Sequence, residues 1–271
     1  MKVFISWLLF LLPATGVLAV ETAAETRTSV WLGFSLLDFD YEEFYDDGST
    51  ADREEGFIPG ATAGAALTRN EWFAETGING WSGDVDYRGP VKSQTAEDMV
   101  DWHALAGREV YRKAGTGLGL FGGFGYRYWK RDIQSTPTAA GLTETYDWWY
   151  GLLGIRGKYR FNTSTSIRAD LSLTRTIDPQ IEVRFPMTYD DITLGLGEKN
   201  GGRLSLVLER RLGRTLSILV SPWYEVWKLG RSSDRVLRQD GMVTGSTVYE
   251  PRSETENLGF DIGVTWRLGV P

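Results

Sequence analysis

The chain has 271 residues, a formal net charge of −7 and no cysteine. The acidic balance argues against nucleic acid as a partner, because proteins that bind nucleic acid present basic patches. The absence of cysteine means that an exported form of the chain folds without disulfide bonds.

The first nineteen residues have the three parts of a secretory signal peptide. Lys2 supplies the positive start, residues 3–12 form an apolar run, and residues 17–19 end on the small residue Ala19. The apolar run is too short to span a membrane, and no later run reaches the ~18 residues that a membrane helix needs. The sequence therefore predicts a signal peptide over 1–19, export through the general secretory pathway, and one mature domain over 20–271.

The mature chain is rich in glycine, with 32 residues, and in aromatic residues, at 13%. Two classes of exported protein fit this composition: a soluble all-β protein and an outer-membrane β-barrel. Apolar and polar residues alternate in ten segments, which indicates strands with one apolar and one polar face. In one of them Leu204, Leu206 and Leu208 alternate with polar residues that include Arg203 and Glu209. The ten predicted strands are 27–42, 57–68, 72–87, 98–112, 118–132, 145–161, 165–177, 201–212, 215–229 and 255–269.

The joints between the predicted strands are alternately short and long. Four short turns are expected at 68–70, 113–117, 162–165 and 212–215. Five long polar loops are expected at 43–56, 88–97, 132–144, 178–200 and 230–254. This pattern predicts an all-β, antiparallel, up-and-down transmembrane barrel of ten strands, with four short periplasmic turns and both termini on the short-turn side.

Alternation alone does not distinguish a membrane barrel from a soluble one, because it does not show which face points outward. A soluble β domain with its aromatic residues in a core remains the alternative. The export signal and the loop asymmetry favour the outer membrane of a Gram-negative-type bacterium, as do aromatic residues near strand ends, where girdles form. Those residues are Trp72, Tyr126, Tyr128, Trp149, Tyr159, Trp223, Tyr224 and Trp266.

The predicted polar face carries charges of both signs. Ten strands enclose little space, so opposite charges in the lumen are expected to pair and close it. A structural network of ion pairs is therefore the first interpretation, and a selective ion path is the alternative. The residues of this face are Glu75, Asp101, His103, Glu109, Arg127, Arg131, Arg156, Lys158, Arg160, Arg168, Asp170, Arg203, Glu209, Arg211, Glu225, Asp261 and Arg267.

The stretch GDVDYRG places Asp84 and Asp86 two residues apart at the outer end of the third predicted strand. On a strand this spacing puts both carboxylates on one side. Like charges at this separation raise each other's pKa. The simplest interpretation is a pair of solvated carboxylates above the membrane, with Arg88 and Lys92 reducing their repulsion.

Calcium binding is another interpretation of the acidic segments, because carboxylates supply the hard oxygen ligands that Ca²⁺ prefers. Asp46 and Asp47, in the first predicted outer loop, are the weak candidates. The sequence has no nucleophile elbow, no phosphate-binding glycine loop and no histidine cluster for zinc. We therefore expect no cofactor and no dedicated metal site.

The order of features resembles the omptins, outer-membrane proteases built on a ten-stranded barrel. Residues 101–129 and 148–161 have the omptin strand rhythm, and the Asp84–Val85–Asp86 stretch falls where omptins keep a catalytic Asp–Asp pair. The resemblance implies an outer-membrane barrel in which Asp84 and Asp86 form half of an endopeptidase site. It also implies lipopolysaccharide as a partner, although the basic set that omptins use for it finds no counterpart here.

The second half of the omptin site is an Asp–His pair in the fourth outer loop region. The corresponding stretch, 176–195, has carboxylates and no histidine: Asp178, Glu182, Asp190 and Asp191. The chain's only histidine is His103, next to Asp101 on the neighbouring fourth strand. A relocated site of Asp84, Asp86, Asp101 and His103 is therefore the catalytic alternative, with the imidazole as the base that titrates near neutral pH.

The function predicted from the sequence is that of a non-proteolytic, omptin-like barrel that acts through its surface loops in binding, adhesion or envelope structure. Its expected partners are outer-membrane lipid, including lipopolysaccharide, and a peptide or surface ligand at the outer loops. Two alternatives remain open: a surface endopeptidase that uses Asp84 and Asp86 with His103, and a small selective channel.

Overall fold

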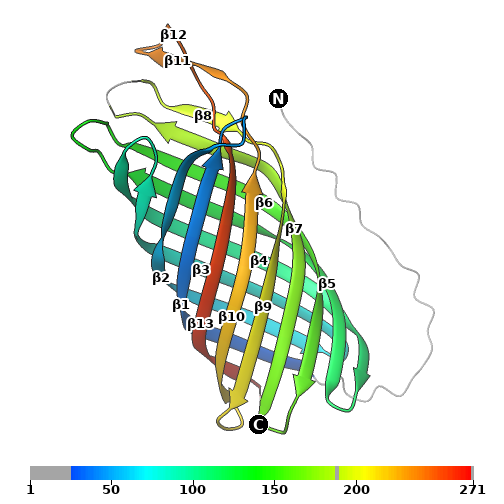
Figure 1. Cartoon of the computed structure of the whole chain (residues 1–271). Helices are drawn as coiled ribbons and strands as arrows, with labels where there is room; N and C mark the ends of the chain where they lie inside the picture. Colours follow the sequence, from blue (N-terminus) through cyan, green and yellow to red (C-terminus); the bar gives the residue numbers. More distant parts are fainter. Residues whose placement is uncertain (1–25, 187–188, 270–271) are drawn as a thin grey trace, which may run out of the picture.

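The computed structural model describes residues 26–186 and 189–269. The signal peptide predicted over 1–19 lies outside these residues. Within them, no helix is long and apolar enough to cross a membrane. Ten long strands form the body of the molecule (Figure 1): β1 (Thr26–Phe44), β2 (Thr50–Arg69), β3 (Trp72–Arg88), β4 (Lys92–Lys113), β5 (Thr116–Ile133), β6 (Leu142–Arg160), β7 (Thr165–Arg184), β9 (Asn200–Arg211), β10 (Leu216–Leu229) and β13 (Arg252–Leu268).

These ten strands close into an antiparallel up-and-down barrel, as predicted. Each pairs with its neighbour in the chain, and the first and last strands pair from Thr28 opposite Leu268 to Phe44 opposite Arg252. Closure leaves no unpaired edge, which is the condition for a sheet to cross a lipid bilayer. Short hairpin turns join the strands at one end of the barrel. In the turn between β4 and β5, Ala114 and Gly115 both have positive φ angles, as a primed two-residue turn requires.

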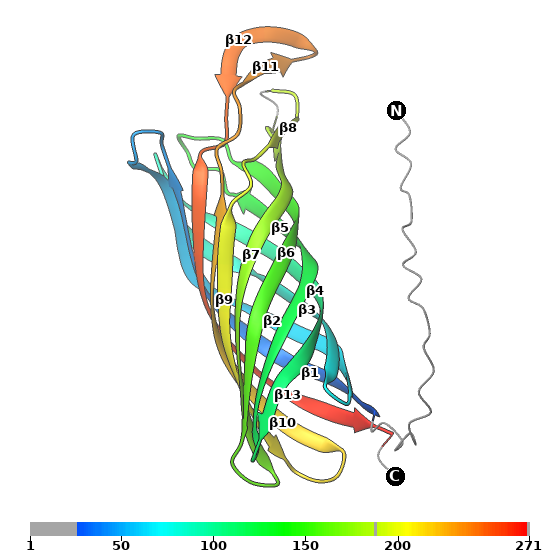
Figure 2. The same ribbon diagram turned by 90° about the vertical axis from the view of Figure 1, so that its right-hand side faces the viewer.

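Three short strands add to the barrel at its loop end. β8 (Ile192–Gly195) pairs with β7, and β11 (Arg235–Gln239) pairs with β12 (Met242–Val248) in a separate two-stranded sheet. Figure 2 shows this hairpin projecting beyond the rest of the barrel. The longest predicted loops, 178–200 and 230–254, therefore contain ordered β structure.

The strands extend further toward the loop end than the alternation predicts. β2 begins at Thr50 instead of 57, β4 begins at Lys92 instead of 98, and β7 ends at Arg184 instead of 177. In β2 the cause is that both faces carry charge there: Arg53 points outward while Glu54 is buried inside. Such a stretch has no apolar face, so alternation of polarity cannot reveal it.

Nearer the short turns, the apolar face of each strand points outward. Leu204, Leu206 and Leu208 are exposed by 44%, 39% and 44%, whereas Arg203 and Glu209 face the interior. We call this outward-facing apolar zone the belt. A contiguous exposed apolar surface of this kind marks contact with lipid. The predicted girdle residue Trp223 is an exception, because it is buried inside the barrel.

On β1 the direction of the alternation reverses where the belt ends. Leu32, Phe34 and Leu36 point outward, but beyond them Phe39 and Tyr41 are buried inside. The outward positions of that upper part are acidic: Asp38, Asp40 and Glu42. The outward-facing residues change from apolar to acidic in the same way between Val100 and Asp98 on β4, and between Leu258 and Glu256 on β13. We call the part of the barrel on the loop side of this boundary the outer section; its outside meets water and its inside holds an apolar core.

Candidate functional site

Asp84 and Asp86 lie in the outer section and point away from the lumen. Both are exposed, while Val85 between them is buried inside, at 3% exposure. They are opposite Ala96 and Gln94 of β4, on the outer face of the wall. Of the basic residues expected to moderate their repulsion, Arg88 is engaged elsewhere, since its guanidinium lies 2.5 Å from a carboxylate oxygen of Glu55.

The structure brings Asp101 and His103 together, but not with Asp84 and Asp86. Both point into the lumen from β4, with His103 Nδ1 3.9 Å from Asp101 Oδ1. His103 is opposite Gly77 of β3, and Asp84 is seven residues further along that strand (84 − 77). At about 3.3 Å per residue this is roughly 23 Å, on the opposite face of the wall. The relocated four-residue site, which the sequence offered as the catalytic alternative, is therefore not assembled.

His103 and Asp101 line a cavity of about 240 Å³ in the lumen at the level of the belt. Its charged side chains are joined in ion pairs. Arg127 lies 3.2 Å from Asp101 and 2.6 Å from Glu225, and Arg156 lies 3.1 Å from Glu75. Further contacts of this network join Arg156 and Arg168 to Asp170, Arg168 to Glu75, Arg203 to Glu225, and Arg267 to Glu209. This is the network of ion pairs that the sequence predicted for the interior.

The carboxylates of the fourth loop region have local structural roles. Asp190 accepts hydrogen bonds from the backbone N–H groups of Asp240, at 3.0 Å, and Gly241, at 2.9 Å, and so holds the turn of the β11–β12 hairpin. Glu182 accepts a hydrogen bond from Arg184, and Asp191 lies 3.9 Å from the same guanidinium. The last of this set, Asp178, is exposed, with a positive φ angle.

The calcium candidates show no shared site. Asp47 accepts hydrogen bonds from the backbone N–H and the hydroxyl of Ser49, and Asp46 lies 3.4 Å from Arg231. In the ranges 26–186 and 189–269, no three His, Cys, Asp or Glu side chains are arranged to hold a metal ion.

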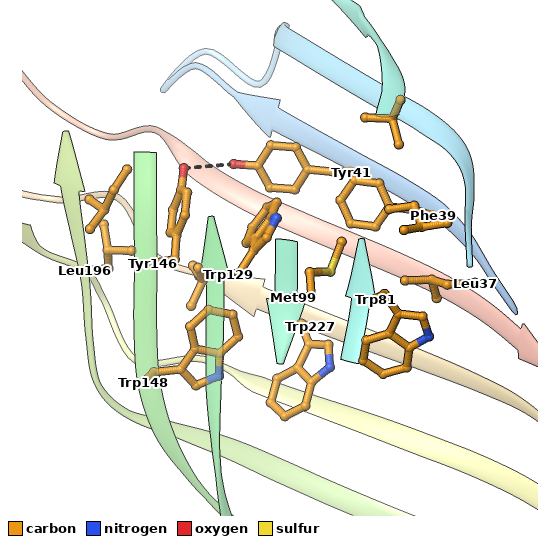
Figure 3. Close-up of a cluster of buried hydrophobic side chains, with 14 of the residues drawn as sticks. Leu37, Phe39, Tyr41, Trp81, Met99, Trp129, Tyr146, Trp148, Leu196 and Trp227 are labelled. Atoms are coloured by element: carbon orange, nitrogen blue, oxygen red, sulfur yellow. Dashed lines mark hydrogen bonds between the residues drawn. The ribbon is translucent and has the colours of Figure 1, made fainter. Parts of the chain in front are cut away.

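The lumen of the outer section is filled by a large aromatic core, which the alternation of apolar and polar residues does not predict (Figure 3). Trp129 stacks on Tyr146, with ring centroids 4.7 Å apart, and Tyr41 meets Trp129 edge-on at 4.9 Å. Trp148 packs against Trp227 at 6.0 Å, on the side of the cavity. The core spans the interior between the cavity and the outer loops, so side chains occupy the path through the barrel.

A single arginine lies among buried carboxyl groups above this core. Arg131, on β5, has 0% exposure, and its guanidinium lies 3.1 Å from Glu54, 2.9 Å from Glu43 and 2.7 Å from Glu144. It also stacks over the ring of Tyr41, at 4.5 Å. We call this group the Arg131 cluster, and its six carboxyl groups are those of Glu43, Asp52, Glu54, Glu97, Glu144 and Glu250.

Burial changes the acidity of this cluster, which lies beyond the belt. It raises the pKa of Asp52 to about 8, and the neighbouring carboxylate of Glu43 adds to the rise. It raises the pKa of Glu144 to about 7, although the charge of Arg131 opposes the shift. Burial also raises the pKa of Glu97 well above its ordinary value, with Glu54 adding to the effect. These carboxyl groups therefore retain protons at pH values where surface carboxyls have lost them.

Comparison with known proteins agrees with this architecture. Residues 10–199 match the family model of the outer membrane protein β-barrel domain. The solved structure of the outer membrane protease OmpT from Escherichia coli matches with a TM-score of 0.59 at 10% identity, over 94% of this chain and 100% of that chain. No curated protein sequence matches the chain.

Two further solved structures match with lower scores. OprG from Pseudomonas aeruginosa has a TM-score of 0.44 at 11% identity, over 91% of this chain and 98% of its own. The translocator domain of the autotransporter NalP from Neisseria meningitidis has a TM-score of 0.45 at 13% identity, over 90% of each chain. At such identities a structural match shows the fold alone. On the family match, which spans more than half of its residues, the chain belongs to the outer membrane protein β-barrel family, and its barrel has the omptin-like ten-stranded form.

Proposed function

We propose that this protein is an outer-membrane barrel without peptidase activity, exported through the general secretory pathway, that acts through its outer loops in binding or adhesion at the cell surface. The observation that carries the non-proteolytic part is the outward direction of Asp84 and Asp86. Its partners are the lipid around the belt, including lipopolysaccharide, and a peptide or other surface ligand at the outer loops.

The geometry of the acidic residues supports the absence of peptidase chemistry. A carboxylate and an imidazole that activate one water must both lie within hydrogen-bond reach of it. Asp84 and His103 are on opposite faces of the barrel wall and roughly 23 Å apart along it. Within the described residues, the carboxyl groups gathered inside the outer section are those of the Arg131 cluster, where Glu54 and Glu97 are exposed by 0% and 1%, so a peptide does not reach them.

A peptidase assay on vesicles that contain the folded protein tests this. We expect the cleavage of a mixture of quenched fluorescent peptides to equal that of vesicles without protein. Cleavage above this background contradicts the proposal. Its loss in Asp84→Asn or His103→Gln, with activity kept in the control Asp98→Asn, would assign it to the omptin-like residues.

The projecting hairpin is the element best placed for a binding role. Its two strands expose Val236, Met242 and Val243, by 48%, 72% and 63%. Exposed apolar side chains grouped on a projecting element are typical of contact surfaces. The hydrogen bonds from its turn to Asp190 restrict its movement relative to the neighbouring loop, which lowers the entropy lost on binding.

We expect the double variant Met242→Ser/Val243→Ser to reduce the attachment of displaying cells to octyl-coated beads. The physical reason is that two exposed apolar side chains lose their contact with the apolar surface. Attachment is counted by flow cytometry, with the exposed hairpin variant Thr247→Ser as a control for display. Equal attachment of wild type and double variant would remove the hairpin from the binding role.

The second candidate function, a small channel, is opposed by the aromatic core. Trp129, Tyr146 and Trp148, each exposed by 3% or less, pack inside the outer section, which supports a closed lumen. We expect no discrete conductance steps in planar bilayers at pH 6 under high protein load. Regular steps of uniform size would contradict a closed lumen and favour the channel.

A further inference from the structure

The Arg131 cluster has more acidic groups than its single positive charge can balance. Six carboxyl groups surround one guanidinium, so full ionisation leaves five uncompensated negative charges (6 − 1). Glu54, Glu97 and Arg131 have 0%, 1% and 0% exposure, so water does not screen them. Uncompensated charge in such a place is strongly unfavourable. The closed arrangement therefore requires several of the carboxyl groups to hold protons.

The hydrogen bonds identify one of the protonated groups. Both carboxylate oxygens of Glu54 are engaged, one by the hydroxyl of Thr95 and the other by Arg131 Nε at 3.1 Å. Glu97 accepts a hydrogen bond from the indole N–H of Trp129 through Oε2, while its buried Oε1 has no hydrogen-bond partner within residues 26–186 and 189–269. A buried carboxylate oxygen without a donor is costly when it is charged, and burial together with the neighbouring carboxylate of Glu54 raises the pKa of Glu97. The proton belongs on Glu97, since Glu54 is the group that contacts Arg131.

From this arrangement we propose that the Arg131 cluster is a buried proton-binding site whose occupancy controls how tightly the outer section of the lumen is closed. The proton is the ligand, since it neutralises carboxyl groups that have no basic partner. Ten titratable or charged groups face one another in the cluster, from β1 to β6 and from the segment before β13: Tyr41, Glu43, Asp52, Glu54, Tyr87, Glu97, Arg131, Glu144, Tyr146 and Glu250.

The sign of the pH effect follows from the direction of the pKa changes. Carboxyl groups whose pKa is raised on folding stabilise the closed form at low pH, and this stabilisation is lost as the pH rises through the folded-state values. Those values are about 7 for Glu144 and about 8 for Asp52. The cluster is therefore compact below about pH 6, and negative charges accumulate in it between about pH 7 and pH 9.

The cluster is joined to the aromatic core, so its repulsion acts on the closure of the lumen. Trp129 donates to Glu97 and stacks on Tyr146, whose hydroxyl lies 3.2 Å from Arg131 Nη1. The hydroxyl of Tyr146 also donates to Glu250, at 2.5 Å. Trp129 and Tyr146 therefore hydrogen-bond to the cluster and also fill the lumen. Repulsion between carboxyl groups that have lost their protons acts on these two side chains and loosens their packing.

The absence of cysteine in the chain allows a direct measurement with one introduced thiol. The reporter variant is Val85→Cys, at a buried position inside the outer section, and the reference variant is Ser82→Cys, on the outward face of the same strand. The folded protein in vesicles is treated with a charged methanethiosulfonate reagent at pH 5.5 to 9. The ratio of the two labelling rates corrects for the thiolate fraction in solution.

We expect this ratio to rise at least about tenfold between pH 6 and pH 9. A tenfold change corresponds to the free energy of a shift of one pKa unit. Adding Glu97→Gln flattens the rise, because the amide keeps an acceptor for Trp129 but does not ionise. Adding Asp38→Asn, on the exposed outer face of β1, leaves the rise unchanged.

A ratio that stays constant from pH 5.5 to 9 would overturn the proposal, as would an unaltered rise in the Glu97→Gln background. Should Glu97→Gln fail to fold, the two cysteine reporters in the otherwise wild-type protein still test the proposal, because the pH dependence of their labelling ratio is measured without that substitution. The result is independent of the peptidase and adhesion assays, which do not involve the protonation of the cluster.

Discussion

Replacement of Arg131 by methionine is expected to lower the free energy of unfolding by about 3–5 kcal/mol at pH 7, the range found when one member of a buried ion pair is removed. Arg131 is the guanidinium that contacts Glu43, Glu54 and Glu144, and methionine retains much of its apolar stem. The loss comes from carboxylates that remain buried without a positive partner. It is measured as the shift of urea-induced unfolding in detergent micelles, followed by circular dichroism.

The pH dependence separates this cause from simple loss of packing. At pH 5.5 more of the carboxyl groups are protonated, so Arg131→Met is expected to be less harmful there than at pH 8.5. The control is Arg88→Met in the same outer section, where the exposed pair with Glu55 is worth under about 1 kcal/mol. An Arg131→Met midpoint equal to that of the wild type at pH 7 would mean that the buried ion pairs do not hold this section.

The second large effect is expected on the outer face of β9. Leu206→Arg places a charge in the middle of the belt, between Leu204 and Leu208, and should destabilise the barrel by about 2–4 kcal/mol in a bilayer. The cost arises because a guanidinium at that depth loses its hydration. The measurement is the folded fraction in lipid vesicles across a urea series, read by far-UV circular dichroism.

The matched control is Gln94→Arg, which adds the same side chain to an exposed outward position of the outer section. It is expected to change the stability by less than about 0.5 kcal/mol, as surface substitutions usually do. If Leu206→Arg were as harmless as Gln94→Arg, the belt would not be in contact with lipid.

The strands of the belt were predictable because lipid outside and charged side chains inside impose a strict two-residue period. Their upper ends were not, because the environment changes there. Residues 50–56 alternate between an aqueous exterior and an interior that also contains charge, such as Glu54. Polarity then carries no information about direction, and the segment looked like a loop. The same limitation hid the extension of β4, where Thr95 and Glu97 are buried inside.

The sequence contains a signal for the direction of Asp84 and Asp86. Lipid requires apolar side chains outward, whereas the outer section requires them inward, so the phase of the alternation must shift at the boundary. On β3, Ile78 points outward in the belt, while Trp81 and Val85 point inward above it. On this strand, even-numbered residues point outward and odd-numbered residues point inward. The change from an even-numbered apolar residue to odd-numbered ones therefore marks the point where the strand leaves the membrane. The spacing of the two aspartates predicts that they lie on one side of the strand. The shift shows that this side is the outer one, because both residue numbers are even.

The Arg131 cluster had no comparable signal. Its members come from β1 to β6 and from the segment before β13, and residues as far apart as Tyr146 and Glu250 share a hydrogen bond. The sequence placed Arg131 in the lumen but gave no partner for it. Such a set is defined by the register of strands around a closed barrel, which a one-dimensional pattern does not contain.

The shift in phase along β1 tests the membrane position of the barrel most directly. Single cysteines at Phe34, Leu36, Phe39, Asp38 and Asp40 can each carry a nitroxide spin label in this cysteine-free chain. The labels at Phe34 and Leu36 should collide with oxygen dissolved in the bilayer, those at Asp38 and Asp40 with a water-soluble nickel chelate, and the label at Phe39 with neither. Nickel collisions at Phe34 and Leu36 as frequent as at Asp38 would contradict the account, because the belt would then lie in water.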